Sequence, residues 1–225
     1  INEKIYDDII KAADITKEDI ILEVGPGLGF LTARLAEKAQ QVIAVELDDK
    51  LATYLQMAVD ASDWENVRVV NQDILRFNVP AELPAERSYK VVANLPYNIS
   101  SIFLRSFLSS PHRPEAFVLM LQKEVAERIV AKPPHMSLLA LSVQYYAEPR
   151  IIREVKAGNF WPEPEVDSAI IRIDSHLVGK QKLSSLESDR LFFRIVKSGF
   201  SAKRKALKNN LIGGLLLDPA LVLSV

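Results

Sequence analysis

The chain of 225 residues contains no cysteine and only three histidines, scattered at His112, His135 and His176. The missing thiols exclude disulfides, thiolate catalysis and zinc–thiolate sites, and three isolated imidazoles do not form a ligand cluster. We therefore expect no metal site. No run approaches the roughly 18 to 20 apolar residues that a membrane span requires, and nothing resembles a secretory signal, so we expect no membrane partner.

The net charge is close to zero, but the charges are unevenly distributed. There are 28 Lys and Arg against 29 Asp and Glu, which gives a formal net charge of −1. Seven basic residues and no acidic residue lie between Arg190 and Lys208. A basic stripe of this kind suits a polyanion, although a solvated helix face is the simpler alternative.

Short apolar runs alternate with segments of helical spacing. We expect strands over 20–24, 41–46, 67–70, 90–94 and 116–121, with helices between them and a further helix over 122–131. This alternation predicts an α/β fold with a parallel sheet and helices on both faces. Two later β-rich runs, 150–155 and 169–173, predict a closing hairpin.

The chain is long enough for one substantial core and a small appendage. From about residue 175 its character changes to polar and basic helix. We therefore expect one domain over 1–174 and a small helical domain over 175–225.

Three glycines, Gly25, Gly27 and Gly29, stand where the first strand passes into a helix, with Glu23 just ahead of them. Glycine lets the backbone approach a ligand closely, and the helix start supplies unpaired amides. A dinucleotide fold prefers G-x-G-x-x-G, so the G-x-G-x-G spacing and the leading acid favour S-adenosylmethionine. A dehydrogenase and a purely structural turn remain alternatives.

Two acidic residues follow the next strands. Glu46 ends the second strand, where a carboxylate can accept both ribose hydroxyls of an adenosine. Asp73 follows the third strand and is placed to accept from the adenine amine of the cofactor, with Leu47 and Ile74 flanking the ring. Taken alone, Glu46 can also be a surface acid and Asp73 a helix cap.

The fourth strand ends in Asn94, Leu95, Pro96 and Tyr97. The Asn94 side-chain oxygen and the Leu95 carbonyl can accept the two N–H groups of an exocyclic amine on a flat base, and Tyr97 can stack on that base. The two acceptors favour a pyramidal nitrogen, whose lone pair is then free to attack a sulfonium methyl. The structural alternative is an ordinary Asn-Pro turn.

A second aromatic candidate lies in a loop between the last two strands. Phe160 and Trp161 precede Pro162 and Pro164, and these prolines hold the loop extended. We expect Phe160 to press on the other face of the base, while Trp161 can equally be a core residue.

These motifs together resemble the ribosomal RNA adenine dimethyltransferases of the kasugamycin-sensitivity type. The resemblance covers nearly the whole chain and includes 23–29 (EVGPGLG), 94–97 (NLPY), 122–128 (QKEVAER), 160–168 (FWPEPEVDS) and 199–211 (GFSAKRKALKNNL). It implies a Rossmann-like class I methyltransferase domain followed by a small helical domain. It also implies transfer of two methyl groups to each of two adjacent adenosines near the 3′ end of small-subunit ribosomal RNA, in an assembling particle.

On this reading each motif has a role. S-adenosylmethionine is the cofactor, held by Glu23, the three glycines, Glu46, Leu47, Asp73, Ile74 and Asn94. The target adenine is held by Asn94, Leu95, Pro96, Tyr97 and Phe160. The basic segment contacts RNA phosphates through Arg194, Lys197, Lys203, Arg204, Lys205 and Lys208.

Other readings remain open at this point. A large-subunit adenine methyltransferase of the macrolide-resistance type shares the catalytic motifs, although the loop over 160–168 and the segment over 204–211 favour the small-subunit enzyme. An organellar transcription or assembly factor can retain the fold without turnover. We expect a cytoplasmic monomer, or an organellar one if a targeting peptide precedes Ile1.

Overall fold

The computed structural model describes residues 2–83, 87–96, 99–176, 186–202 and 205–215. Its strands are β1 Ile20–Val24, β2 Gln41–Glu46, β3 Val67–Asn71, β4 Lys90–Asn94, β5 Ala116–Gln122, β6 Ala147–Val155 and β7 Ser168–Ser175. Its helices are α1 Glu3–Ala13, α2 Phe30–Ala36, α3 Asp49–Asp60, α4 Val79–Glu82, α5 Ser100–Leu108, α6 Lys123–Val130, α7 Leu138–Gln144, α8 Leu186–Gly199 and α9 Leu207–Leu215, with 3-10 turns η1 Ile74–Arg76 and η2 Ala157–Asn159.

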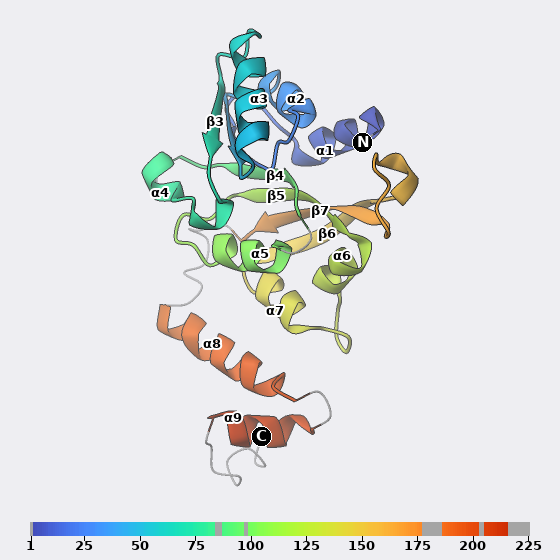
Figure 1. The fold of residues 1–225 in the computed structure, drawn as a ribbon. Coiled ribbons are helices and arrows are strands. Elements are labelled where there is room, and N and C mark those ends of the chain that lie inside the picture. Colours follow the sequence, from blue (N-terminus) through green and yellow to red (C-terminus); the bar gives the residue numbers. More distant parts are fainter. Residues whose placement is uncertain (1, 84–86, 97–98, 177–185, 203–204, 216–225) are drawn as a thin grey trace.

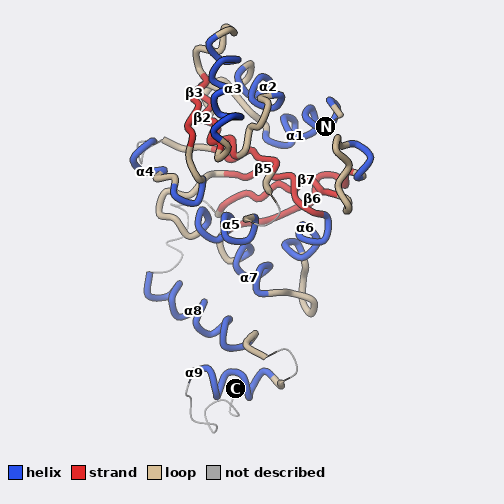
Figure 2. Tube along the Cα trace, viewed as in Figure 1, coloured by secondary structure: helices blue, strands red, loops and turns tan. Residues whose placement is uncertain are grey.

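The strands form one sheet in the order β3-β2-β1-β4-β5-β7-β6 (Figures 1 and 2). The first five are parallel, which confirms the expected α/β architecture. The expected hairpin of β6 and β7 is also present, and β7 pairs antiparallel with both β5 and β6. Gln122 was expected to start a helix, but it pairs with Ser168 and therefore extends β5.

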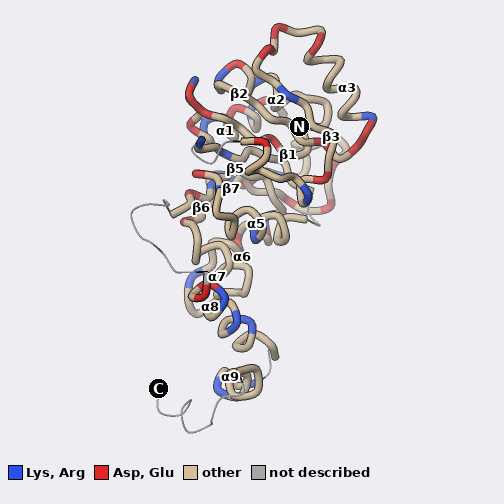
Figure 3. The backbone as a smooth tube through the Cα atoms, turned by 90° about the vertical axis from the view of Figure 1, so that its left-hand side faces the viewer, with Lys and Arg blue, Asp and Glu red and all other residues tan. Residues whose placement is uncertain are grey.

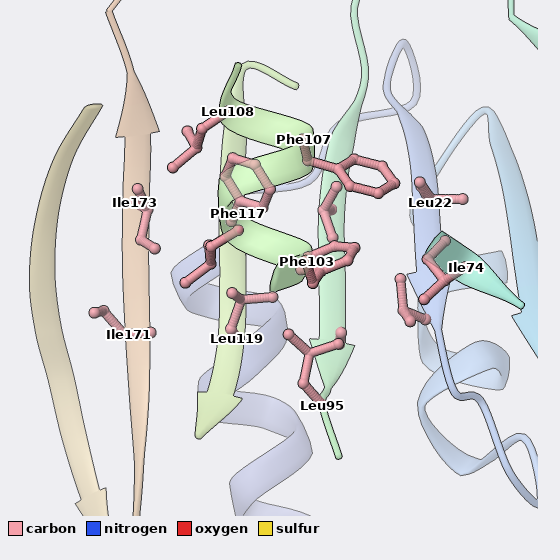
Figure 4. Close-up of a cluster of buried hydrophobic side chains, with 14 of the residues drawn as sticks. Leu22, Ile74, Leu95, Phe103, Phe107, Leu108, Phe117, Leu119, Ile171 and Ile173 are labelled. Atoms are coloured by element: carbon pink, nitrogen blue, oxygen red, sulfur yellow. The ribbon is translucent and has the colours of Figure 1, made fainter. Parts of the chain in front are cut away.

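Strand side chains alternate between two apolar layers. Leu22 and Phe117 face the larger core, where Phe103 of α5 packs over the strands (Figure 4). Residues of α4, α6 and α7 belong to the same core. Ile21 and Val118 face the opposite side, covered by α1 and α2, while α3 packs beside them over β2 and β3. Both faces are covered, as a parallel sheet requires, so the polar groups that bind ligands lie at the strand ends.

Helix α8 docks on α7 through aromatic rings and one carboxylate. The rings of Tyr145 and Phe192 stack with centroids 4.1 Å apart. Asp189 accepts hydrogen bonds from the hydroxyls of Tyr145 and Tyr146 at 2.9 and 3.1 Å. These contacts fix α8 against the sheet domain, and the division at residue 174 stays a prediction. None of the helices in the described ranges has the length and apolar character of a membrane span.

We expect Phe117→Ala to lower the free energy of unfolding by about 3–5 kcal/mol, because the fully buried ring leaves a cavity between the sheet and α5. The measurement is urea denaturation followed by circular dichroism. Trp161→Ala is the control, since this ring is 92% exposed. Equal losses for both variants would contradict the packing described for the larger core.

Candidate functional site

The carboxyl ends of the parallel strands bring the predicted site residues to one edge of the sheet. Gly25 directly follows β1, Glu46 ends β2, Asp73 follows β3 and Asn94 ends β4. Strands β1 and β4 are adjacent, with Val24 opposite Ala93. The glycine loop and the Asn94 turn therefore leave the sheet side by side.

All three loop glycines have positive φ, at 64° for Gly25, 58° for Gly27 and 81° for Gly29. A Cβ atom on Gly29 would lie 2.6 Å from Leu55 Cδ1, so Gly29 is required for packing against α3. A Cβ atom on Gly27 would meet nothing within 4 Å. Gly27 therefore faces open space, where the backbone can contact a ligand directly.

Glu46 joins the end of β2 to the glycine loop. Its Oε2 accepts from the Gly27 amide at 3.0 Å, and its Oε1 accepts from the Asp48 amide at 3.0 Å. A carboxylate has about four lone-pair directions, so each oxygen can still accept a hydroxyl. Glu46 is 7% exposed, and its two backbone donors fix its orientation, while its role in binding a ligand stays a prediction.

Glu23 lies in β1 beneath the loop and is 1% exposed. Neither carboxylate oxygen has a hydrogen-bond partner within the described part of the chain. Burial, opposed by the nearby Thr32 hydroxyl and reinforced by the Glu46 carboxylate, raises the pKa of Glu23 to about 8. A buried, unpartnered carboxyl beside open glycine backbone fits a ligand that carries a positive charge, as S-adenosylmethionine does.

Three further predicted cofactor contacts, Asp73, Leu47 and Ile74, lie around the ends of β2 and β3. Asp73 caps η1, because its Oδ1 accepts a hydrogen bond from the Leu75 amide at 2.9 Å. The role of helix cap, which the sequence analysis gave as the alternative for this residue, is therefore confirmed. Leu47 is 69% exposed and free to cover a flat ring. Ile74 is buried in the larger core and offers a ligand little surface. Their ligand roles stay predictions.

A cavity of about 320 Å³ lies beside the Asn94 turn. It is lined by Asn94, Leu95 and Pro96 from the turn and by Phe160, Pro162 and Pro164 from the loop before β7. Among the described residues no donor bonds to the Leu95 carbonyl, and the Asn94 side chain is exposed. Asn94 is therefore open to a ligand in this cavity, whereas Leu95 is 2% exposed and the acceptor role of its carbonyl stays a prediction.

The loop that forms the far wall is extended at Phe160, whose φ and ψ are −114° and 153°. Alternate residues, Phe160, Pro162 and Pro164, line the cavity, whereas the Trp161 ring is 92% exposed. The Asp167 carboxylate holds the base of the loop by accepting from the Ala157 amide at 3.0 Å. Phe160, and not Trp161, therefore lines the cavity beside Asn94, and its contact with a base stays a prediction.

The predicted phosphate contacts lie on or beside the C-terminal helices α8 and α9, where Figure 3 shows Lys and Arg among other residues. Arg194 and Lys197 are exposed on α8. Lys205 is exposed just before α9, and Lys208 is exposed in its first turn. Three predicted residues lie outside the described ranges, namely Tyr97, Lys203 and Arg204.

Reasoning from sequence missed two parts of this site. Pro162 and Pro164 were assigned only a stiffening role, yet both line the cavity, and their spacing of two residues after Phe160 was the available signal. The Asp48 amide, which fixes Glu46, was also missed. Every residue except proline has a backbone N–H group, so the sequence could not indicate which amide binds Glu46.

Residues 1–215 match the family model described as ribosomal RNA adenine dimethylase. Among curated proteins, the chain is 43% identical over 225 residues to ribosomal RNA small subunit methyltransferase A of Dehalococcoides mccartyi strain CBDB1, covering 100% of this chain and 76% of the relative. It is 37% identical over 211 residues to the protein of the same name from Clostridium acetobutylicum, covering 93% of this chain and 75% of the relative.

Solved structures agree with this match. A dimethyladenosine transferase from Plasmodium falciparum superposes with a TM-score of 0.76 at 30% identity, covering 93% of this chain and 73% of the other. The 23S rRNA methyltransferase ErmE superposes with a TM-score of 0.77 at 26% identity, covering 95% of this chain and 83% of the other.

The raised pKa of Glu23 should make the stability of the ligand-free protein depend on pH. Because its pKa in the folded state is raised to about 8 from 4.5, the unfolded chain loses this proton first. The contribution of Glu23 to stability is therefore fully present below pH 4.5 and declines as the pH rises to about 8. Glu23→Gln cannot titrate, so we expect its stability relative to wild type to increase between pH 5 and pH 8, by on the order of 4 kcal/mol.

The measurement is urea denaturation of both proteins across this pH range. Glu37→Gln, an exposed acid at the end of α2, is the matched control and should follow wild type. A difference between Glu23→Gln and wild type that does not change with pH would contradict the assigned environment of Glu23.

Proposed function

Because the chain belongs to the ribosomal RNA adenine dimethylase family, we propose that it methylates two adjacent adenosines near the 3′ end of small-subunit ribosomal RNA within a pre-ribosomal particle. Each adenosine receives two methyl groups on its exocyclic amine. The observation that carries the proposal is the single cavity shared by Asn94, Leu95, Pro96 and Phe160, next to the glycine loop.

S-adenosylmethionine supplies an electrophilic methyl group on a sulfonium when it is bound. Glu46 accepts the ribose hydroxyls, with its two oxygens already oriented by the Gly27 and Asp48 amides. Glu23 faces the positive charge of the cofactor, which gives its unpartnered oxygens a partner. Asp73 and Leu47 contact the cofactor's adenine, Asp73 through the oxygen that does not cap η1.

Asn94 and Leu95 activate the target amine by hydrogen bonding. The lone pair of an adenine amine is delocalised into the ring, so the free amine is a poor nucleophile. Two acceptors on its N–H groups favour a pyramidal nitrogen and direct its lone pair at the methyl group. No strong general base is required, because the nitrogen becomes acidic only after it is alkylated.

The second methyl transfer requires a cavity that accepts an amine already carrying one methyl group. The walls formed by Pro96, Pro162, Pro164 and the Phe160 ring are apolar and suit that methyl group. The methylated amine keeps one N–H for one of the two acceptors. Dimethylation is therefore compatible with the lining of this cavity.

The small-subunit substrate is favoured over the large-subunit alternative by similarity. The relatives at 37–43% identity are named for the small subunit, whereas the 23S rRNA methyltransferase structure shares 26%. In this proposal the predicted domain over 1–174 holds the target adenosine. The predicted domain over 175–225 contacts RNA phosphates through Arg194, Lys197, Lys205 and Lys208, which lie on or beside α8 and α9.

Asn94→Ala should abolish methylation of unmodified small subunits, lowering the rate by at least about 100-fold, because one of the two acceptors on the amine is lost. Cofactor binding, measured by calorimetry, should change less than about tenfold, because Glu46 and the glycine loop are intact.

Asn78→Ala is the matched control, since Asn78 is exposed and makes no side-chain cap on α4. It should methylate at the wild-type rate. Turnover retained by Asn94→Ala would refute the assigned role of the turn.

A further inference from the structure

A second cavity, of about 500 Å³, lies between α5, α7 and α8. Four cationic side chains line it, Arg105 from α5 and Arg190, Arg194 and Lys197 from α8. It shares no lining residue with the cavity beside Asn94. Arg190 was counted in the basic stripe but not assigned a contact, and Arg105 was not singled out from the sequence, because the two come together only when α8 docks on the sheet domain.

The four cations are exposed, and within the described ranges none of them forms an ion pair. Asp189 is the acidic residue in the lining, and its two oxygens accept from the Tyr145 and Tyr146 hydroxyls. The cavity thus has an excess of positive charge. Like charges gathered in one cavity repel each other, and a bound anion relieves that repulsion.

The geometry favours phosphate as that anion. Three of the four cations are arginines, whose planar guanidinium groups match phosphate oxygens with paired hydrogen bonds. They approach from two sides, Arg105 from the sheet domain and the others from α8. Phe193 and Leu138 add apolar surface to the same cavity, which suits the sugar or base of a nucleotide.

Helix α5 connects this cavity to the proposed adenine site. The Ser100 hydroxyl, in the first turn of α5, donates to the Pro96 carbonyl at 3.3 Å. Arg105 lies five residues further on, about 7.5 Å along the helix axis. An anion bound by Arg105 is therefore held at a fixed separation from a base beside Asn94.

We infer that this cavity binds backbone phosphates of the RNA substrate next to the target adenosines, clamped between Arg105 and the cations of α8. The inference rests on the proposed function and adds a second anchoring point to it. Arg105 and Arg190 position the substrate and take no part in the methyl transfer.

The test compares Arg105→Gln and Arg190→Gln with wild type. The probe is a labelled oligoadenylate of about 12 nucleotides, with binding followed by fluorescence anisotropy at several salt concentrations. Each variant should weaken binding by about tenfold and reduce the slope of log K against log salt by about 0.7, the value for one lost phosphate contact on a single strand. With unmodified small subunits, KM for RNA should rise while kcat and cofactor affinity stay unchanged.

Lys38→Gln is the control, because it removes one exposed positive charge from the turn after α2, away from both cavities. It should match wild type in affinity and salt slope. Arg105, Arg190 and Lys38 are all exposed, so we expect the three variants to fold. Thermal melting checks that expectation.

If both Arg105→Gln and Arg190→Gln bind the oligonucleotide with the wild-type affinity and salt slope, the inference is overturned. The proposed function still holds in that case if the enzyme methylates RNA. Binding of AMP that is lost in Arg105→Gln, with RNA affinity unchanged, would assign the cavity to a small phosphorylated ligand and also overturn it. A wild-type protein that neither binds nor methylates RNA would refute the proposed function itself.

Discussion

The hydrogen bonds accepted by Glu46 determine the geometry on which the rest of the site depends. One carboxylate fixes the amide of Gly27 in the loop after β1 and the amide of Asp48 after β2, both at 3.0 Å. The parallel sheet brings these strand ends together, and the positive φ angles of the glycines let the loop turn sharply into α2. The same carboxylate keeps lone pairs for a ligand. The support of the glycine loop and the proposed binding of the cofactor therefore depend on the same carboxylate.

The sequence predicted those parts of the molecule that follow from local patterns. The strands over 20–24, 41–46 and 90–94, the closing hairpin and the grouping of Asn94 with Phe160 are all present in the structure. The position of β7 between β5 and β6 was not predicted, because sheet order depends on pairings between distant segments. The capping bond of Asp73 was foreseen as an alternative and is present, whereas the cluster around Arg105 was not foreseen, because it requires α8 to dock on α7.

Helix α5 relates the two cavities physically. It starts at the turn that follows Asn94, packs Phe103 and Phe107 into the larger core, and presents Arg105 at the junction with α8. A core helix moves little relative to its sheet, so the distance between base and phosphate sites is set by packing. The aromatic contacts of Tyr145 with Phe192 fix the other side of the clamp. In the proposed binding mode, one RNA strand would contact the protein at two points that packing holds at a set distance.

We propose that adenosines of the small ribosomal subunit bind in the cavity beside Asn94 and are dimethylated there. The most direct measurement incubates the protein and S-adenosylmethionine with purified small and large subunits that lack the modification, and maps the products by mass spectrometry of RNA fragments. The account predicts two adjacent N6,N6-dimethyladenosines near the 3′ end of the small-subunit RNA and none in the large subunit. Methylation confined to large-subunit RNA, or single methyl groups only, would contradict it.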